Sequence, residues 1–474
     1  MKIVLHGFGT YPFVFRHLVA AARKTAPQLE WAVILPNPHH RALMREVVDD
    51  NDILSLQDHL VRDIQPLRDA SELSRYPGRI FANIEAEKYA FKHRPAWEQL
   101  ARAAEIYRVY KEFLQRIKPT HILIPQIEGY EGRMLPHLAD ELGIDVMIPV
   151  LGRNLGGTFF SPDAEESLPR FASASPASVE AARKFVARFR SEGVPATGPA
   201  RTSADDEILG SSGRSLPART IEFVRRSVAR PDLFEVEHLR TSILNNLPWF
   251  RDTMWRLNRK RGEREFDVAQ LEDLPKHFIY YPLQVTPESS INTPAPYFVD
   301  QLRAIDAIRF AMPNDHLLLV KEHPSAILTR PPSFVQSLRK RAGVAVAHYR
   351  TDSRTLIERA ALTVSITGTA TLEAFLLGRP ALTLGPSFVA RYLGGICGLD
   401  ELRSRIRQAA DQLPSDNAVV QAVAEVFSVS YDFALRPPGL PGEPGLRRGN
   451  IERMLAAILD HAAREKAATR GAAQ

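Results

Sequence analysis

Residues 362–377 read LTVSITGTATLEAFLL, and this stretch decides the fold of the C-terminal half of the chain. Its first residues are apolar and β-compatible, which predicts a buried strand, whereas Ala370–Leu377 has the periodicity of a helix. Between them, Gly368 permits a tight turn. A strand, a glycine turn and a helix in this order are typical of a parallel α/β sheet, in which a helix crosses over to the next strand.

The same turn predicts a phosphate site. Backbone N–H groups and the helix dipole favour an anion at a helix N-terminus. The hydroxyls of Ser365, Thr367 and Thr369 can donate to oxygen ligands. An ordinary helix cap would use the same residue types. We favour the phosphate interpretation because strand, glycine turn and hydroxyl cluster coincide. Glu373, one turn into the helix, can reach a ribose hydroxyl or complement the helix dipole.

Strands and helices alternate on both sides of this motif. In the C-terminal half we expect further strands at Phe278–Tyr281, His316–Val320, Val344–Ala347 and Ala381–Leu384. In the N-terminal half we expect strands at Lys2–Leu5, Trp31–Leu35, His121–Pro125 and Val146–Val150, with helices at Phe13–Thr25 and Trp97–Ile117. This alternation predicts two parallel sheets. The predicted division is an N-terminal Rossmann-like domain (1–160), a helical and loop insertion (161–266), a C-terminal Rossmann-like domain (267–436), and a connector with a final helix (437–474).

Two further polar loops follow predicted strands of the C-terminal domain. Lys321-Glu322-His323-Pro324 comes directly after one strand, at the sheet edge where open α/β folds bind ligands. Pro324 disfavours a helical backbone at His323, so its imidazole can project over the strand end and donate to a phosphate oxygen. Lys321 points to the same side. A solvated loop histidine is the alternative.

The other loop, residues 281–290, reads YPLQVTPESS and follows the first strand of that domain. Its two prolines hold an extended polar segment, in which Gln284, Glu288 and Ser289 can face the space between the two domains. A structured surface turn explains the loop equally well.

Together these motifs resemble a known family. Tyr-Pro-Leu-Gln…Pro-Glu-Ser, Lys-Glu-His-Pro and Ser-Ile-Thr-Gly-Thr-Ala-Thr-Leu-Glu-Ala…Gly-Arg-Pro-Ala look like the capsule polysaccharide biosynthesis glycosyltransferases, which include bacterial β-Kdo transferases. They are also similar to GT-B sialyltransferases that use CMP-activated acids. The resemblance covers Tyr280–Gly385 and, in outline, the N-terminal half. It implies a GT-B fold, in which two doubly wound Rossmann-like domains face a cleft.

The resemblance also implies roles in donor binding. His323 and Ser365 with Thr367 would hold the donor phosphate, Lys321 would contact the base or phosphate, and Glu373 the ribose. The expected donor-binding residues are Lys321, His323, Ser365, Thr367, Gly368, Thr369, Glu373, Gln284 and Glu288.

In this family the catalytic carboxylate comes from the N-terminal domain. The best match is Glu128 in Glu-Gly-Tyr-Glu-Gly-Arg (128–133), with Glu131 second. A carboxylate there can deprotonate an acceptor hydroxyl or attack the anomeric carbon. Helix capping is the alternative for Glu128. Arg133 or Arg153 would pair with the carboxylate of a sugar acid. The matched motifs contain no Asp-x-Asp metal sequence, which fits metal-independent chemistry, and no cofactor is expected.

The composition indicates in which compartment the protein acts and which classes of partner it can bind. The chain has 474 residues, 45% of them hydrophobic, and a single cysteine, Cys397, which excludes an internal disulfide and favours a reducing cytoplasm. The net charge of +6 is small for this length and comes with no nucleic-acid-binding signature. We find no apolar run long enough to cross a bilayer. Basic residues interleaved with Trp249, Phe250 and Trp255 suggest contact with an anionic membrane or a lipid-linked acceptor, or else a helical linker with inward-facing aromatics.

We therefore expect a cytoplasmic glycosyltransferase of bacterial capsule or surface polysaccharide assembly, with peripheral attachment to the inner membrane left open. Its partners would be a CMP-activated sugar acid such as Kdo and a saccharide or lipid-linked saccharide acceptor. The alternatives are a UDP-sugar transferase, a CDP-polyol phosphotransferase of the teichoic-acid kind, and a non-catalytic GT-B scaffold in a polysaccharide assembly complex.

Overall fold

The computed structural model describes residues 1–36, 38–60, 64–66, 80–86, 94–192, 266–268, 271–286, 289–323, 326, 330–435 and 448–472. Most of the predicted insertion lies outside these residues, including Trp249, Phe250 and Trp255. So does Glu288, in the loop after the first strand of the C-terminal domain. Within the described residues, no helix is both long enough and apolar enough to span a membrane.

The N-terminal domain is built on a six-stranded sheet with the order β3-β2-β1-β4-β5-β6. All neighbouring strands are parallel except β6, which is antiparallel to β5. The strands are β1 (Lys2–His6), β2 (Glu30–Leu35), β3 (Ile53–Ser55), β4 (His121–Leu123), β5 (Asp145–Leu151) and β6 (Thr158–Ser161). The helices are α1 (Tyr11–Thr25), α2 (Arg41–Arg45), α3 (Ile80–Glu85), α4 (Ala96–Ile117) and α5 (Gly129–Leu142). The next helix, α6 (Pro176–Glu192), packs against the C-terminal half of the chain.

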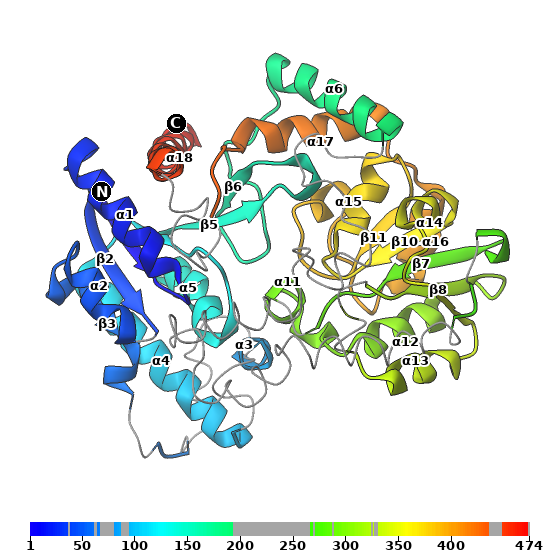
Figure 1. Cartoon of the computed structure of the whole chain (residues 1–474), viewed down its shortest axis with the longest axis horizontal. Coiled ribbons are helices and arrows are strands. Elements are labelled where there is room, and N and C mark those ends of the chain that lie inside the picture. The colour runs from blue at the N-terminus through cyan, green and yellow to red at the C-terminus, as the bar shows by residue number, and fades with distance from the viewer. Residues whose placement is uncertain are drawn as a thin grey trace, which may run out of the picture.

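The two faces of this sheet are covered by different helices (Figure 1). One hydrophobic cluster joins alternate strand residues to α1 and α2, and a second joins the opposite face to α4 and α5. Strands that are buried on both faces read as continuous apolar runs, as β1 does. The helix α5 ends at Gly143, whose left-handed backbone (φ 66°) is the usual glycine stop of a helix.

The C-terminal domain contains a five-stranded, wholly parallel sheet with the order β11-β10-β7-β8-β9. Its strands are β7 (Phe278–Pro282), β8 (Leu317–Lys321), β9 (Val344–Ala347), β10 (Leu362–Ser365) and β11 (Ala381–Thr383). Its helices are α11 (Ser289–Asn292), α12 (Gln301–Ala311), α13 (Pro332–Arg339), α14 (Ser353–Arg359), α15 (Thr369–Leu376) and α16 (Leu402–Asp411). Apolar residues of α12, α13 and α16 pack on one face of the sheet, and those of α14 and α15 on the other.

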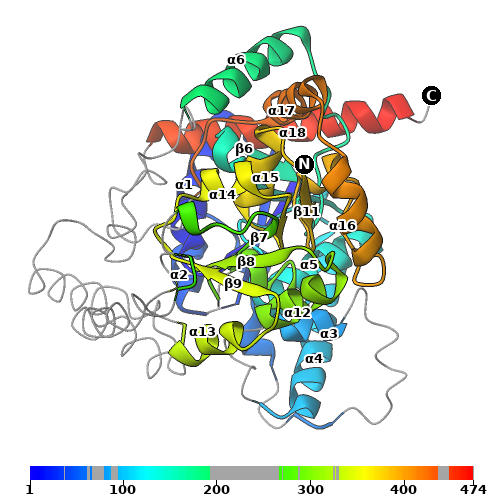
Figure 2. The same cartoon turned by 90° about the vertical axis from the view of Figure 1, so that its right-hand side faces the viewer.

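The last two helices connect the domains. α17 (Asp416–Val429) packs against α6, and both contribute to a cluster that also contains Leu372 and Phe375 of α15. The chain then returns, pairing Tyr431 with Thr158, and α18 (Arg448–Ala472) packs along α1 (Figures 1 and 2). The final helix, predicted as a separate tail, thus contributes to the core of the N-terminal domain.

Both sheets have the Rossmann strand order. Counted within each domain, the order is 3-2-1-4-5, with a sixth strand added in the N-terminal domain. This confirms the predicted α/β class with two Rossmann-like domains of the GT-B type. The order reverses between β1 and β4 and between β7 and β10. Such switch points are where open α/β sheets bind ligands, so they locate the candidate sites.

Candidate functional site

The switch point of the C-terminal sheet brings the loop after β7 against the loop after β10. Gln284, two residues beyond β7, is held through its backbone by Gln301 of α12. The Gln284 N–H donates to Gln301 Oε1 (2.8 Å), and Gln301 Nε2 donates to the Gln284 carbonyl (2.7 Å). Both side chains are buried. This exchange fixes the Gln284 side chain toward β10.

The Gln284 side chain fills the turn between β10 and α15. Its amide lies 3.4 Å from Ser365 Oγ and 3.3 Å from Thr367 Oγ1. With the amide oxygen turned toward the loop, it accepts from the N–H groups of Thr367 (3.0 Å) and Gly368 (2.5 Å). Two backbone N–H groups of the predicted phosphate turn are therefore engaged by a side chain of the chain itself.

Ser365 and Thr367 are buried, and they shape this turn from the inside. Ser365 is fully buried, and its Oγ accepts from the Gly368 N–H at 3.1 Å. Thr369, by contrast, is exposed and opens α15, with Gly368 as the N-cap. The outer surface at this helix end consequently offers Thr369 and first-turn backbone N–H groups to an anion. Ser365 and Thr367 therefore shape the turn, whereas Thr369 is the hydroxyl that a ligand can contact.

The loop after β8 lies beside the Gln284 loop, because β8 neighbours β7, and β7 separates it from the turn after β10. Lys321 is mostly buried, and its Nζ donates to Ser353 Oγ at 2.6 Å, which directs it toward α14. His323 is half-buried, and its N–H donates to the Glu322 carboxylate at 2.8 Å. Of the two residues predicted in this loop, His323 is the one with a side chain partly open to solvent.

Sequence reasoning missed three residues at this site: Gln301, Glu322 and Arg330. Glu322 forms a buried ion pair with Arg330 (2.6 Å), and Arg330 also donates to the Gln284 carbonyl at 2.6 Å. Glu322 stands inside the quoted Lys-Glu-His-Pro motif, so its position was visible, although its buried partner was not. Gln301 and Arg330 lie on other segments and carried no sequence signal.

The switch point of the N-terminal sheet holds the predicted carboxylate. Glu128 is buried and occupies the N-cap position of α5, but its side chain makes no capping hydrogen bond, so the capping interpretation is wrong. Gln126 Nε2 donates to Glu128 Oε1 at 2.8 Å, and Tyr11 donates to Gln126 at 3.2 Å. Burial raises the pKa of the Tyr11 hydroxyl, and the nearby Glu128 carboxylate adds to that rise.

The remaining predicted residues of this domain have different surroundings. Glu131 lies in the first turn of α5, and its charge adds to the burial that raises the pKa of Tyr110. Arg133 donates to Asn83 at 2.9 Å. Arg153 binds both carboxylate oxygens of Glu166 (3.0 and 2.7 Å), so its positive charge is already matched.

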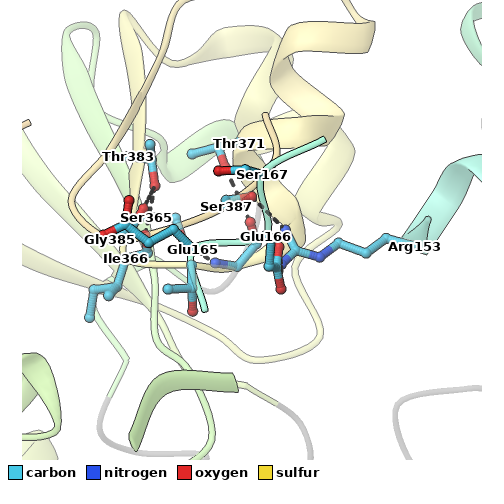
Figure 3. A network of polar contacts seen from close by, with 12 residues as sticks. Arg153, Glu165, Glu166, Ser167, Ser365, Ile366, Thr371, Thr383, Gly385 and Ser387 are labelled. Carbon is cyan, nitrogen blue, oxygen red and sulfur yellow. Dashed lines mark hydrogen bonds and ion pairs between the residues drawn. The ribbon is translucent and has the colours of Figure 1, made fainter. Parts of the chain in front are cut away.

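Arg153 also reaches the other domain. It lies in a short 3-10 helix, η5 (Arg153–Leu155), and donates to Ser387 at 2.9 Å, with its guanidinium 5.3 Å from the Phe388 ring centroid. Figure 3 shows Arg153 extending toward Glu166 and Ser387. Its neighbour Asn154 donates to Glu373 at 3.1 Å. These contacts tie the N-terminal domain to α15 and to the loop after β11.

The structure thus brings together only part of the predicted set. Gln284, Ser365, Thr367 and Gly368 form one hydrogen-bonded unit beside the His323 loop, whereas Glu128 belongs to the opposite domain. Among the described residues, no group of three or more His, Cys, Asp or Glu side chains could hold a metal ion.

No protein-family model matches the chain, and no curated protein matches it. Among solved structures, the β-Kdo 2,7 transferase KpsC of Thermosulfurimonas dismutans is similar at 12% identity, covering 86% of this chain and 90% of that chain, with a TM-score of 0.31. MnaA of S. aureus, solved with UDP, is 11% identical over 98% of this chain and 97% of that one (TM-score 0.25).

The UDP-GlcNAc 2-epimerase of Methanocaldococcus jannaschii, in complex with UDP-GlcNAc and UDP, is 12% identical over 90% of this chain and 99% of its own (TM-score 0.25). Structural similarity at TM-scores this low does not assign a function to this chain. The fold assignment therefore rests on the strand order of the two sheets.

Proposed function

We propose that this protein is a glycosyltransferase that binds a nucleotide-sugar donor at the switch point of its C-terminal sheet. The observation that carries the proposal is that three polar loops follow neighbouring strands at one edge of the parallel sheet. They follow β7, β8 and β10, and they present a prearranged turn, the exposed Thr369 and the half-buried His323. Phosphate oxygens suit such a site, since backbone N–H groups, a hydroxyl and an imidazole all donate to them.

The opposite domain supplies the carboxylate for the reaction in this proposal. Glu128 lies at the equivalent switch point of the N-terminal sheet, and its side chain is not used to cap α5. As a base it would remove the proton of an acceptor hydroxyl, and as a nucleophile it would attack the anomeric carbon.

The donor we propose is a CMP-activated sugar acid of the Kdo kind, used in bacterial capsule or surface-polysaccharide assembly. This part rests on the resemblance of the three C-terminal motifs to the capsule glycosyltransferases. Arg133 and Arg153 are the two candidates for binding the sugar carboxylate, and Arg153 would have to share its guanidinium with Glu166. The proposed acceptor is a saccharide or a lipid-linked saccharide. Peripheral contact with an anionic membrane stays a prediction, because the residues that motivate it lie outside the described part of the chain.

Calorimetric titration of CMP, UDP and CDP tests the proposal. The wild-type protein, His323→Ala and His316→Ala are compared, and His316 serves as the control because it immediately precedes β8, at the opposite end of the same strand from His323. Selective CMP binding that is about tenfold weaker in His323→Ala and unchanged in His316→Ala supports a CMP-sugar transferase, since tenfold corresponds to one lost hydrogen bond to a charged group.

Other outcomes of this titration identify the alternatives. A preference for UDP indicates a UDP-sugar transferase, and a preference for CDP indicates a polyol phosphotransferase. If none of the three nucleotides binds, the glycosyltransferase proposal fails and a non-catalytic scaffold of the same fold replaces it.

A further inference from the structure

A buried ion pair lies behind the proposed donor site. Arg330 Nε and Glu322 Oε2 are 2.6 Å apart, and the two side chains are only 8% and 6% exposed. The guanidinium also lies 4.7 Å from the centroid of the Phe334 ring. Burial raises the pKa of the Glu322 carboxyl, while the charge of Arg330 and hydrogen bonds from Arg330 and the His323 N–H act in the opposite direction.

Stability alone does not account for such a pair. Two charges lose their hydration on burial, and a well-packed apolar pair of similar volume is often as stable or more stable. Removing one partner, in contrast, is strongly destabilising, because it leaves the other charge uncompensated. A buried pair at this position is better explained by the other hydrogen bonds that Glu322 and Arg330 make.

Each member of the pair holds a different ligand loop. Glu322 accepts the N–H of His323 at 2.8 Å, which sets the backbone from which the imidazole projects. Arg330 donates to the Gln284 carbonyl at 2.6 Å, on the same oxygen that Gln301 Nε2 reaches at 2.7 Å. Gln284 in turn carries the amide that fills the turn before α15.

Arg330 is therefore the one side chain among these that touches both loops. Resting on the function proposed above, we infer that Arg330 is a positioning residue that sets the spacing between His323 and the phosphate turn before α15. It acts on the donor phosphate through Glu322 and Gln284. Arginine suits this task because its planar guanidinium can donate in two directions at once, which a lysine ammonium does not reproduce in the same geometry.

The test separates positioning from stability with three variants. Arg330→Met leaves Glu322 buried without its partner, so both the melting temperature and nucleotide affinity fall. The double variant Arg330→Met/Glu322→Gln removes both charges at nearly constant volume, and the new amide oxygen still accepts the His323 N–H. We expect its melting temperature to recover while its CMP affinity stays about tenfold below wild type, the cost of a misplaced phosphate contact.

Arg309→Met is the matched control. Arg309 forms an ion pair with Asp306 (3.0 Å) and lies 4.6 Å from the centroid of the Phe310 ring, but it contacts neither ligand loop among the described residues. Its loss should leave CMP affinity unchanged. Unchanged affinity in the double variant, with a recovered melting temperature, overturns the positioning role while leaving the proposed function standing. Absence of nucleotide binding by the wild-type protein removes the proposed function and the inference together.

Discussion

Asn154 of the N-terminal domain donates a hydrogen bond from Nδ2 to Oε1 of Glu373 in α15, over 3.1 Å. The Glu373 carboxylate, which is predicted to bind the ribose, therefore also takes part in a contact between the two domains. A carboxylate has two oxygens and can accept more than one donor, so both contacts can exist at once. In that case, nucleotide binding and the contact between the domains act on the same side chain.

The ribose role of Glu373 predicts a loss of discrimination between ribose and deoxyribose. Wild-type protein should bind CMP more tightly than 2′-deoxy-CMP, and Glu373→Gln should bind the two with nearly equal affinity, because the amide accepts a hydroxyl hydrogen bond more weakly than the carboxylate does. Titration calorimetry measures both ligands. Asn154→Ala, which keeps the carboxylate, is the control and should retain the discrimination. Equal discrimination in wild type and Glu373→Gln would show that Glu373 does not bind the ribose.

Glu128 and Glu131, at the start of α5, should differ in their effect on turnover. Glu128→Gln keeps the shape of the buried side chain but removes its charge, so we expect turnover to fall by at least about 100-fold, the lower range for a lost general base, with CMP affinity unchanged. Glu131→Gln should change turnover by less than about threefold. Steady-state rates with a CMP-sugar donor, together with CMP titration, check this. The reverse order of effects would transfer the catalytic role to Glu131.

A methyl group at Gly368 should disturb the phosphate turn. A Cβ built there would lie 2.7 Å from Ser365 Oγ and 2.9 Å from Gln284 Nε2, so the Gln284 amide would have to move. We expect Gly368→Ala to lower stability by about 1–3 kcal/mol, as overpacking does, and to weaken CMP binding. Gly449→Ala in α18 is the control, because its Cβ would meet nothing closer than 3.8 Å. Wild-type affinity in Gly368→Ala would show that the turn tolerates a displaced Gln284.

His6 should make the protein sensitive to mild acid. It ends β1, both ring nitrogens are buried with no hydrogen-bond partner among the described residues, and burial lowers the pKa of its imidazole to about 3. A histidine with a lowered folded-state pKa contributes stability that is present above its unfolded pKa near 6.5 and is lost as the pH falls toward 3. Between pH 7 and pH 5 the loss is about 2 kcal/mol.

Thermal unfolding of wild type and His6→Gln from pH 7 to pH 5 measures this loss. The variant should show a flatter profile, although not a flat one, because burial also lowers the pKa of His461 to about 4 and adds a loss of the same sign. Parallel profiles for the two proteins would rule out His6 as a source of the acid sensitivity.

Much of the C-terminal sheet could be predicted because its strands are short apolar runs followed by turn residues. The strand at Leu362–Ser365 and the helix after Gly368 lie within one residue of their predicted positions. The orientation of the hydroxyls could not be predicted. Ser365 and Thr367 face inward because Gln284, 81 residues before Ser365, fills the turn, and no local pattern encodes a partner at that distance.

The N-terminal site shows the same limit. The acidic turn at 128–133 was visible, but only the structure shows that Glu128 does not cap α5. The pairing of Arg153 with Glu166 spans 13 residues within an irregular loop and gave no periodic signal. Helix and strand periods therefore predicted the main elements of both sheets, whereas the sequence has no comparable signal for which side chains contact each other.

The return of α18 to α1 has a consequence for how the chain folds during its synthesis. Ile451, Met454 and Leu455 cover apolar residues of α1, so the face of the first helix stays open to water until the chain beyond Arg448 has left the ribosome. The first domain to be synthesised is in this respect the last to be completed. A nascent chain that exposes an apolar helix for so long is a natural client for a chaperone.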